Sequence, residues 1–159
     1  MMCAVYVVVL GSMSTAVAAL QSSRVATTLL GAIGPRPIAF ASTVDAEGKP
    51  NLAPFSFFNV FSANPPILIF SPARSGRTNT TKDTYNNVKV VPEVVINVVN
   101  YDIVHQMSLA SSPYAPGVNE FEKAGFTALK SDSVKPFRVA ESPVQFECKV
   151  NEVIELGTE

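Results

Sequence analysis

The sequence predicts a mainly β (α+β) domain, a small β-barrel with short helices packed against it. Short apolar runs recur at close spacing along the chain, and turns rich in Pro, Gly and Ser separate them. Of the 159 residues, 47% are hydrophobic and 16% are charged, which suits a single domain with a buried core and excludes a disordered chain. Together, these observations favour short strands closed around one core, with small helices covering it.

The body of the chain begins with a predicted β-hairpin. Residues 37–44 form an apolar run, residues 45–48 form a polar turn that ends in Gly48, and residues 49–58 are expected to return as the second strand. Later strands are expected at residues 67–70, 94–99, 126–129 and 144–156. In the last strand, alternation places Val144, Phe146, Cys148 and Val150 on one face.

Three short helices are expected between these strands. They span residues 80–90 with Thr80 as N-cap and Asp83 in the first turn, residues 101–110 after Asn100 as N-cap, and residues 119–124 before Gly125. The segments 111–118 and 131–143 are rich in Ser and Pro and are expected to be loops.

The first 23 residues are unusual because they carry no charge. An apolar run at residues 4–10 precedes a small-residue stretch at 12–19, and four interpretations stay open: a core strand with a short helix, an atypical leader, a membrane anchor, and a gene-model or fragment artefact. A leader would need basic residues before the apolar run, whereas Arg24 is the first charge. We therefore separate an atypical segment, residues 1–28, from a domain at residues 29–159.

Charge, cysteine and histidine content exclude several function classes. A net charge of −1 provides no basic field for nucleic acid or for an anionic membrane. Two cysteines, Cys3 and Cys148, make no disulfide framework, and one histidine excludes a multi-His metal site. We expect Cys148 to be a buried apolar side chain and His105 to lie on a helix surface. The sequence offers no Ser-His-Asp set and no evident proton-transfer pair.

Residues 71–84 form the one basic concentration in the chain, directly after an apolar run and before a predicted helix. The segment contains three cations and one acid, with hydroxyl residues between them. The cations are Arg74, Arg77 and Lys82, and the acid is Asp83. Cations, hydroxyls and the N–H groups of a helix start are what a phosphate monoester requires, so the segment favours a compact anion. The alternative is a solvated polar loop that leads into a capped helix. Neither a Walker loop nor a Rossmann glycine turn is present.

Residues 51–66 gather aromatic side chains with amides and hydroxyls between them. The aromatic members are Phe55, Phe57, Phe58 and Phe61. An apolar wall with a few polar groups suits a flat heteroaromatic ring. The alternative is an aromatic core strand.

Taken together and in this order, these stretches resemble the flavin reductase-like family of FMN-binding split β-barrels. The matching runs are residues 36–43, 50–61, 64–66 and 82–84, and the resemblance covers residues 29–157. It implies a split β-barrel, a homodimer with FMN near the subunit interface, and hydride transfer from NADH or NADPH to the flavin. Members of the family normally continue past the last strand, so two interpretations stay open here: a barrel that lacks C-terminal strands, and a sequence that is a fragment of a longer chain.

The resemblance further implies which residues bind the cofactor. The FMN phosphate is expected to meet Arg77, Thr81, Lys82, Asp83 and Thr84. The isoalloxazine is expected to lie along Ser56, Phe57, Phe58 and Asn59, largely against their backbone groups. Weaker candidates are Ser42, Thr43 and Ser71.

The leading hypothesis is a cytoplasmic FMN flavoprotein, an NAD(P)H-dependent flavin reductase-type oxidoreductase. The flavin carries the chemistry, so no side chain is expected to be catalytic and no metal is expected. A partner monooxygenase or redox protein is a further expectation, with neither nucleic acid nor a membrane as partner. Two alternatives are a non-catalytic FMN-binding electron-transfer module and a truncated structural or dimerisation chain without flavin.

Overall fold

The computed structural model describes residues 3–10, 27–75, 78–115 and 117–156, and its main element is a mixed seven-stranded sheet in the order β3-β2-β6-β9-β1-β5-β4. The strands are β1 (Cys3–Leu10), β2 (Ala39–Val44), β3 (Pro50–Phe55), β4 (Phe58–Ala63), β5 (Pro66–Phe70), β6 (Glu93–Val98) and β9 (Gln145–Leu156). A separate two-stranded sheet pairs β7 (Ala128–Leu129) with β8 (Arg138–Val139). The expected mainly β class with short helices is confirmed.

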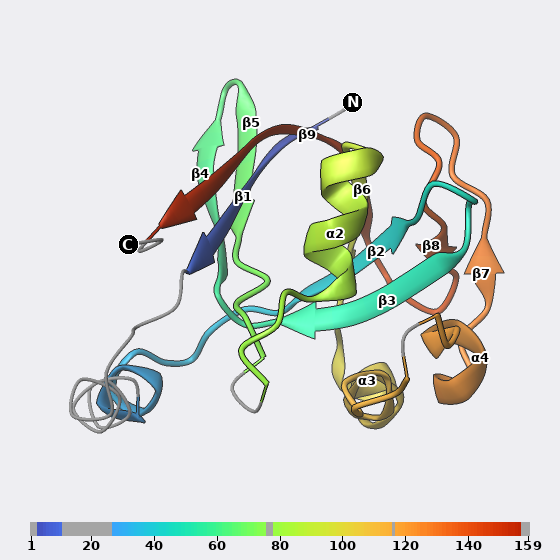
Figure 1. Cartoon of the computed structure of the whole chain (residues 1–159), viewed down its shortest axis with the longest axis horizontal. Helices are drawn as coiled ribbons and strands as arrows, with labels where there is room; N and C mark the ends of the chain where they lie inside the picture. Colours follow the sequence, from blue (N-terminus) through green and yellow to red (C-terminus); the bar gives the residue numbers. More distant parts are fainter. Residues whose placement is uncertain (1–2, 11–26, 76–77, 116, 157–159) are drawn as a thin grey trace.

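Short helices cover the sheet, as Figure 1 shows. They are α2 (Asp83–Val90), the 3-10 helix η1 (Tyr101–Ile103), α3 (Val104–Ala110) and α4 (Glu120–Ala124), and residues 27–32 are also helical. In Figure 1, α2 lies across the sheet beside β2, β3 and β6, whereas α3 and α4 lie next to each other below β3. Among the described residues, no helix is both long and apolar enough to cross a membrane.

The predicted hairpin of residues 37–58 is present in its first part. Strands β2 and β3 pair antiparallel from Ala39 opposite Phe55 to Val44 opposite Pro50. Asp45 closes the turn, because its carboxylate accepts the N–H groups of Glu47 and Lys49 at 3.0 and 2.8 Å, and Gly48 takes a φ of 82°. This turn brings Asn51 opposite Thr43, which matters for the site below.

Strand β2 is buried along its whole length because two cores meet at it. Ala39 and Ala41 join a cluster formed with β1, β5, β6, β9 and Val88 of α2. Phe40 points into a second cluster formed with Leu52 and the apolar side chains of η1, α3 and α4. The Phe40 ring meets Phe126 edge to face, with ring centroids 5.3 Å apart. Thus the apolar character of residues 39–44 is explained by burial on both faces of the strand.

The N-terminal apolar run forms strand β1. Of the four interpretations, the structure of residues 3–10 agrees with the core strand. Strand β1 lies between β5 and β9 and runs parallel to both, with Val5 opposite Leu68 and Val150. Val5 and Val7 are fully buried, as expected for a central parallel strand. The small-residue stretch at residues 12–19 lies outside the described residues.

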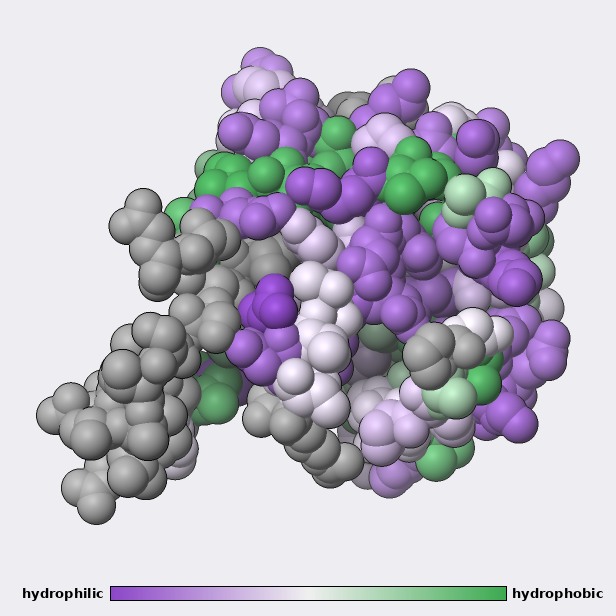
Figure 2. Space-filling model, viewed as in Figure 1, coloured by the Kyte–Doolittle hydropathy of each residue, from purple (hydrophilic) through white to green (hydrophobic). Residues whose placement is uncertain are grey.

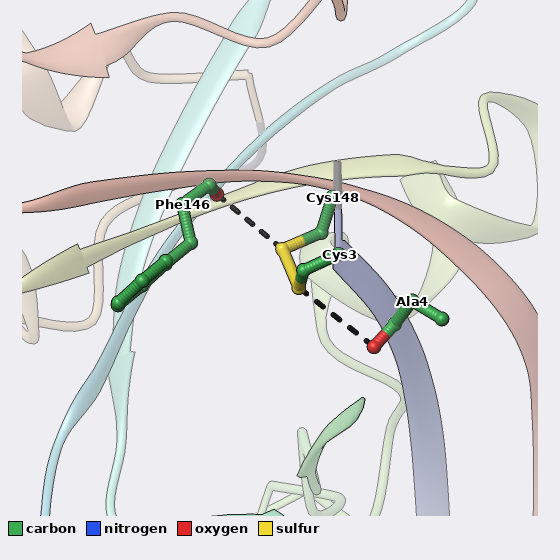
Figure 3. The surroundings of a disulfide bond; sticks show 4 residues. All are labelled: Cys3, Ala4, Phe146 and Cys148. Carbon is green, nitrogen blue, oxygen red and sulfur yellow. Dashed lines mark hydrogen bonds between the residues drawn. A yellow bond between two sulfur atoms is a disulfide. The ribbon is translucent and has the colours of Figure 1, made fainter. Parts of the chain in front are cut away.

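A disulfide joins Cys3 at the start of β1 to Cys148 on β9, where the two residues are direct partners in the ladder with Cα atoms 4.6 Å apart. Figure 3 shows both side chains turned toward each other beneath the strands. The sulfur of Cys148 lies 3.5 Å from the carbonyl oxygen of Phe146. Cys148 is buried, as expected, but it is a bonded cysteine rather than an isolated apolar side chain, which corrects the prediction. Because 145 residues separate the pair, no local pattern could reveal it.

Three predicted boundaries differ from the structure. Helix α2 begins at Asp83 and not at Thr80, because the Thr80 hydroxyl lies 2.8 Å from that of Thr78 and so does not cap the helix. The strand expected at residues 49–58 ends at Phe55, and after a bend the chain returns as β4. Of the strand expected at residues 126–129, only β7 forms, and its partner β8 lies within the segment 131–143 expected to be a loop.

Other expectations are confirmed by side-chain contacts. Asn100 accepts the N–H of Ile103 at 3.3 Å and Asn119 accepts that of Phe121 at 3.1 Å, so both act as N-caps. His105 is exposed on α3. The predicted alternation of buried residues on β9 is only partly present. Val144 precedes the strand and Phe146 is 41% exposed, whereas Cys148 is buried, and the pairing register shifts after Val150.

Candidate functional site

A cavity of about 180 Å³ opens between strand β3, the start of α2, the segment after α3 and the start of α4. Its lining residues are Asn51, Ala53, Pro54, Phe55, Lys82, Asp83, Thr84, Ala110, Ser111, Ser112, Pro113, Tyr114 and Glu120. The cavity thus brings together three of the residues expected at a phosphate, Lys82, Asp83 and Thr84, and the end of the aromatic strand at Phe55.

The start of α2 is one wall of this cavity. Its N-cap, Lys82, has an extended backbone and makes no side-chain cap hydrogen bond within the described residues, and the first helical bond runs from the Asn86 N–H to the Lys82 carbonyl at 3.1 Å. The N–H groups of the first turn therefore point out of the helix beside the exposed Lys82 side chain. A helix N-terminus with an adjacent ammonium group is suited to bind an anion.

Buried polar side chains lie beneath the start of α2. The side-chain nitrogen of Asn51 donates to the hydroxyls of Thr43 at 3.1 Å and Thr84 at 2.9 Å, and Asn87 donates to Thr43 at 3.1 Å. Both Thr43 and Thr84 were expected near the cofactor from the sequence. Their hydroxyls are instead engaged in this network, which joins β2, β3 and α2.

The loop of residues 71–82 is held largely by its own contacts. The Arg74 guanidinium donates to the carbonyl and side-chain oxygens of Asn79 at 2.9 and 3.0 Å, and the Thr81 hydroxyl donates to Asn86 at 3.0 Å. Ser75 N–H donates to the Thr80 carbonyl at 2.9 Å. Arg77 lies outside the described residues. Of the three cations predicted here, Lys82 is the one that the structure places at the cavity.

Residues 56–59 continue directly from the cavity lining but do not themselves line it. Residues 56 and 57 form the bend, and residues 58 and 59 begin β4. The Phe57 carbonyl accepts the Ser71 N–H at 2.9 Å, and the Ser56 hydroxyl accepts Arg36 Nε at 3.3 Å. Asn59 accepts the N–H of Val60, and Phe58 is half-buried against the core of the sheet. The segment therefore presents Phe57 and Asn59 to solvent next to the cavity.

The two serine candidates lie deeper. Ser42 on β2 is fully buried, and Ser71 follows β5. Among the described residues, neither hydroxyl has a hydrogen-bond partner. The structure does not bring Ser42 or Ser71 to the cavity lining.

Glu120 and residues 111–114 are cavity residues that the sequence reasoning missed. The Glu120 carboxylate accepts the Leu52 N–H at 3.0 Å and thereby ties α4 to β3. Burial raises the pKa of the Glu120 carboxyl above its usual value, against the lowering effect of the Leu52 hydrogen bond. The nearby negative charge of Asp83 raises it as well. The sequence signal for Glu120 was only its place after the N-cap Asn119, which also suits a helix with no site.

Figure 2 shows where the remaining surface is hydrophobic. Green side chains form a band across the upper part of this view, below the purple tip of the β4–β5 hairpin, whereas the surface around α2 is mainly purple. On the edge strand β4, Val60 and Phe61 are each 62% exposed. An edge strand with exposed apolar side chains is a surface that proteins commonly cover.

Comparison with known proteins agrees with this fold. The model of the flavin reductase like domain family matches residues 32–159. An uncharacterized protein of Aquifex aeolicus is 44% identical over 122 residues, which are 77% of this chain and 62% of that protein. The chain spans between 58% and 62% of the length of the first three curated relatives that it matches.

Two solved structures are similar over most of the chain. Nitrilotriacetate monooxygenase component B from Bacillus cereus is 30% identical with a TM-score of 0.77, over 89% of this chain and 69% of that one. The 2-nitrobenzoate 2-nitroreductase of Pseudomonas fluorescens is 29% identical with a TM-score of 0.71, over 86% and 64% of the two chains. The mixed sheet with its short helices is the split-barrel fold of these flavin reductase-like proteins. The chain therefore belongs to the flavin reductase like domain family.

Proposed function

We propose that the chain is a flavin-dependent oxidoreductase that binds FMN, with the FMN phosphate at the start of α2. The observation that carries the proposal is the N-terminus of α2, which opens on the cavity without a side-chain cap and beside Lys82. Lys82 supplies a charge and the first-turn N–H groups supply donors, as a phosphate requires. Thr81, Arg77, Asp83 and Thr84 complete the proposed phosphate segment.

The size of the cavity is consistent with one end of the cofactor. Pockets that enclose a ligand of this size measure roughly 300–1,000 Å³, whereas this cavity measures about 180 Å³. The cavity therefore suits the FMN phosphate and the part of the cofactor bonded to it, but not the whole cofactor. The ring would extend along the open bend at Ser56, Phe57, Phe58 and Asn59, which continues from Phe55 at the cavity. Ser42, Thr43 and Ser71 would support the site from within the sheet rather than from the cavity lining.

We propose that the reaction is NAD(P)H-dependent flavin reduction, in which bound FMN supplies a ring nitrogen that accepts hydride. The protein then acts through position and environment. Lys82 holds the phosphate, and the segment 56–59 presents backbone groups and the exposed Phe57 side chain to the ring. None of these roles needs a catalytic side chain.

The proposed assembly is a homodimer that covers the apolar edge of β4. Its support is the exposure of Val60 and Phe61 on β4 and of Phe57 just before that strand. The likeness to a monooxygenase component B supports a partner monooxygenase as electron acceptor. A cytoplasmic location stays a prediction. The Cys3–Cys148 disulfide argues against it, because cytosolic thiols are normally kept reduced.

An FMN titration of the purified chain followed by the visible flavin spectrum tests the proposal. We expect saturable binding with a shifted flavin band, and then oxidation of NADH or NADPH that depends on the bound flavin. Binding without nicotinamide oxidation would leave the electron-transfer alternative, and a folded chain that binds no flavin would contradict the proposal.

A charge deletion locates the phosphate. Lys82→Ala should weaken the binding of FMN by roughly 1.5–3 kcal/mol and the binding of riboflavin by much less, since riboflavin has no phosphate. The matched control is Lys89→Ala, because Lys89 lies in the last turn of the same helix and pairs with Glu155 instead. Equal losses for FMN and riboflavin in Lys82→Ala would place the phosphate elsewhere.

A further inference from the structure

The four buried polar side chains under α2 form a defined network across three elements. Thr43 on β2 and Thr84 on α2 are 0% and 1% exposed, and Asn51 on β3 and Asn87 on α2 are each 9% exposed. Figure 1 shows α2 standing over the β2–β3 hairpin at this point. Buried polar groups are costly unless they are paired, so a network of this kind selects one placement of the helix on the hairpin.

The two asparagines have different tasks in the network. Asn51 donates from one nitrogen to Thr43 at 3.1 Å and to Thr84 at 2.9 Å, and so connects the hairpin to the first turn of α2. Asn87 lies one turn further along α2 and donates to Thr43 at 3.1 Å, with no contact to Thr84 among its hydrogen bonds in the described chain. Only Asn51 therefore acts on the residue that directly follows Lys82 and Asp83.

We propose that Asn51 is a positioning residue for the phosphate end of the cofactor site and acts through Thr84. By holding the Thr84 side chain down on β3, Asn51 orients the first-turn N–H groups and the Lys82 N-cap toward the cavity, whose lining includes Asn51 itself. Anion binding by a helix start depends on the direction of these N–H groups, so a small rotation of the first turn weakens it. The inference rests on the proposed function, because the anion in question is the FMN phosphate.

The test compares Asn51→Leu with the matched variant Asn87→Leu in titrations with FMN and riboflavin. Both substitutions remove donors to Thr43 at equal burial, so both should lower the melting temperature. Asn51→Leu should lower the affinity for FMN about tenfold, because one well-placed hydrogen bond contributes about a factor of ten. The affinity for riboflavin should fall less than about threefold, because riboflavin has no phosphate to lose this contact. Asn87→Leu should leave the ratio of the two affinities unchanged. A ratio that shifts equally in both variants, or in neither, would overturn the inference.

A second set of variants keeps the inference testable if Asn51→Leu does not fold. Thr84→Val removes the hydroxyl that accepts the Asn51 bond, and Thr84→Ser retains it. The first should lower the ratio of FMN to riboflavin affinity and the second should restore it. Where both single variants fold, the double variant of Asn51→Leu and Thr84→Val should lose no more than the larger single loss, since the two residues act in series. Additive losses would contradict a role through Thr84.

Hydrogen exchange separates this inference from the proposed function. If the parent chain binds no FMN, the proposed function fails, but the backbone amides at residues 86–90, the first of which donates to the Lys82 carbonyl, still report the placement of α2. Asn51→Leu should then raise their exchange rates more than Asn87→Leu does. Equal exchange in the two variants would overturn the positioning role of Asn51, whether or not FMN binds.

Discussion

Glu120 shows how one half-buried carboxyl group affects the site. Its carboxyl lines the cavity that also contains Lys82 and Asp83, and burial raises its pKa above the usual value of 4.5. A raised pKa means that the folded state favours the neutral acid. The group therefore contributes stability below pH 4.5, and that contribution is lost as the pH rises through the raised pKa.

Replacing the acid by its neutral analogue tests this directly. Glu120→Gln is uncharged at every pH and can still accept the Leu52 N–H through its amide oxygen, so it should melt higher than the parent at pH 7 and similarly near pH 4. It should also bind FMN more tightly at pH 7, because a negative charge beside the proposed phosphate is removed. Thermal melts at the two pH values measure the first effect. The same difference in melting temperature at both would show that titration of Glu120 is not its cause.

At the scale of elements, the ends of the short helices decide where the cavity walls stand. Helix α4 carries Glu120 and has only five residues, so its caps matter more than its length. Asn119 caps one end, and Gly125 ends the other with a φ of 71°. The carbonyl of Gly125 also accepts the Gln106 side chain of α3 at 3.1 Å, which joins the two helices.

A pair of glycine substitutions tests the C-terminal cap. Gly125→Ala should destabilise the fold by about 1 kcal/mol, because a Cβ disfavours the left-handed conformation. The matched change, Gly31→Ala, adds a Cβ with no atom within 4 Å in the helical segment 27–32 and should be neutral or slightly stabilising. Denaturant unfolding measures both. A Gly125→Ala variant as stable as Gly31→Ala would show that the cap does not hold α4.

For the whole molecule, the central position of β1 is the main architectural feature outside the family match. Residues 32–159 match the family model, whereas β1 is formed by residues 3–10 and supplies the link between β9 and β5. Within the sheet, the β4–β5 hairpin thus pairs with the other strands through β1. The Cys3–Cys148 disulfide fastens this strand to β9.

Removing the disulfide should therefore lower the stability of the entire sheet. In the loop-closure account a bond across 145 residues contributes about 5 kcal/mol, which corresponds to a fall in melting temperature of about 10 °C or more for a chain of this size. Cys3→Ser and the parent in reducing buffer should melt alike and below the oxidised parent. If reduction leaves the melting temperature of the parent unchanged, the disulfide does not hold β1 in the sheet.

The exposed apolar edge makes a prediction about assembly. A change of Phe61 to Ser on β4 removes a side chain that is 62% exposed, so it should weaken a dimer that covers this edge while leaving the monomer folded. Sedimentation of parent and variant over a range of concentrations measures the association. The matched control is Tyr101→Ser, because Tyr101 is an exposed aromatic residue at the start of η1, away from β4. A parent chain that sediments as a monomer at every concentration would contradict the proposed dimer.

Local patterns located much of the fold and part of the candidate site. The turn chemistry of Asp45 and Gly48 predicted the β2–β3 hairpin, and Asn100 and Asn119 predicted two helix starts, because each is determined by neighbours in sequence. Lys82 was predicted at an anion site from the charges and hydroxyls around it, and the structure places it at the cavity. Its exact contacts with a phosphate stay a prediction.

The short strands, most helix caps and the resemblance to one family could be predicted before the structure, since these depend on residues close together in the chain or on their order. The remaining features come from tertiary packing. This packing is not encoded in any one segment. It paired Cys3 with Cys148, placed β1 between two strands, turned Thr84 toward Asn51 and brought Glu120 to the cavity. These features join residues from 33 to 145 positions apart. Only the packing of the completed sheet and helices brings such residues within contact, so no local pattern of hydrophobicity or capping contains them.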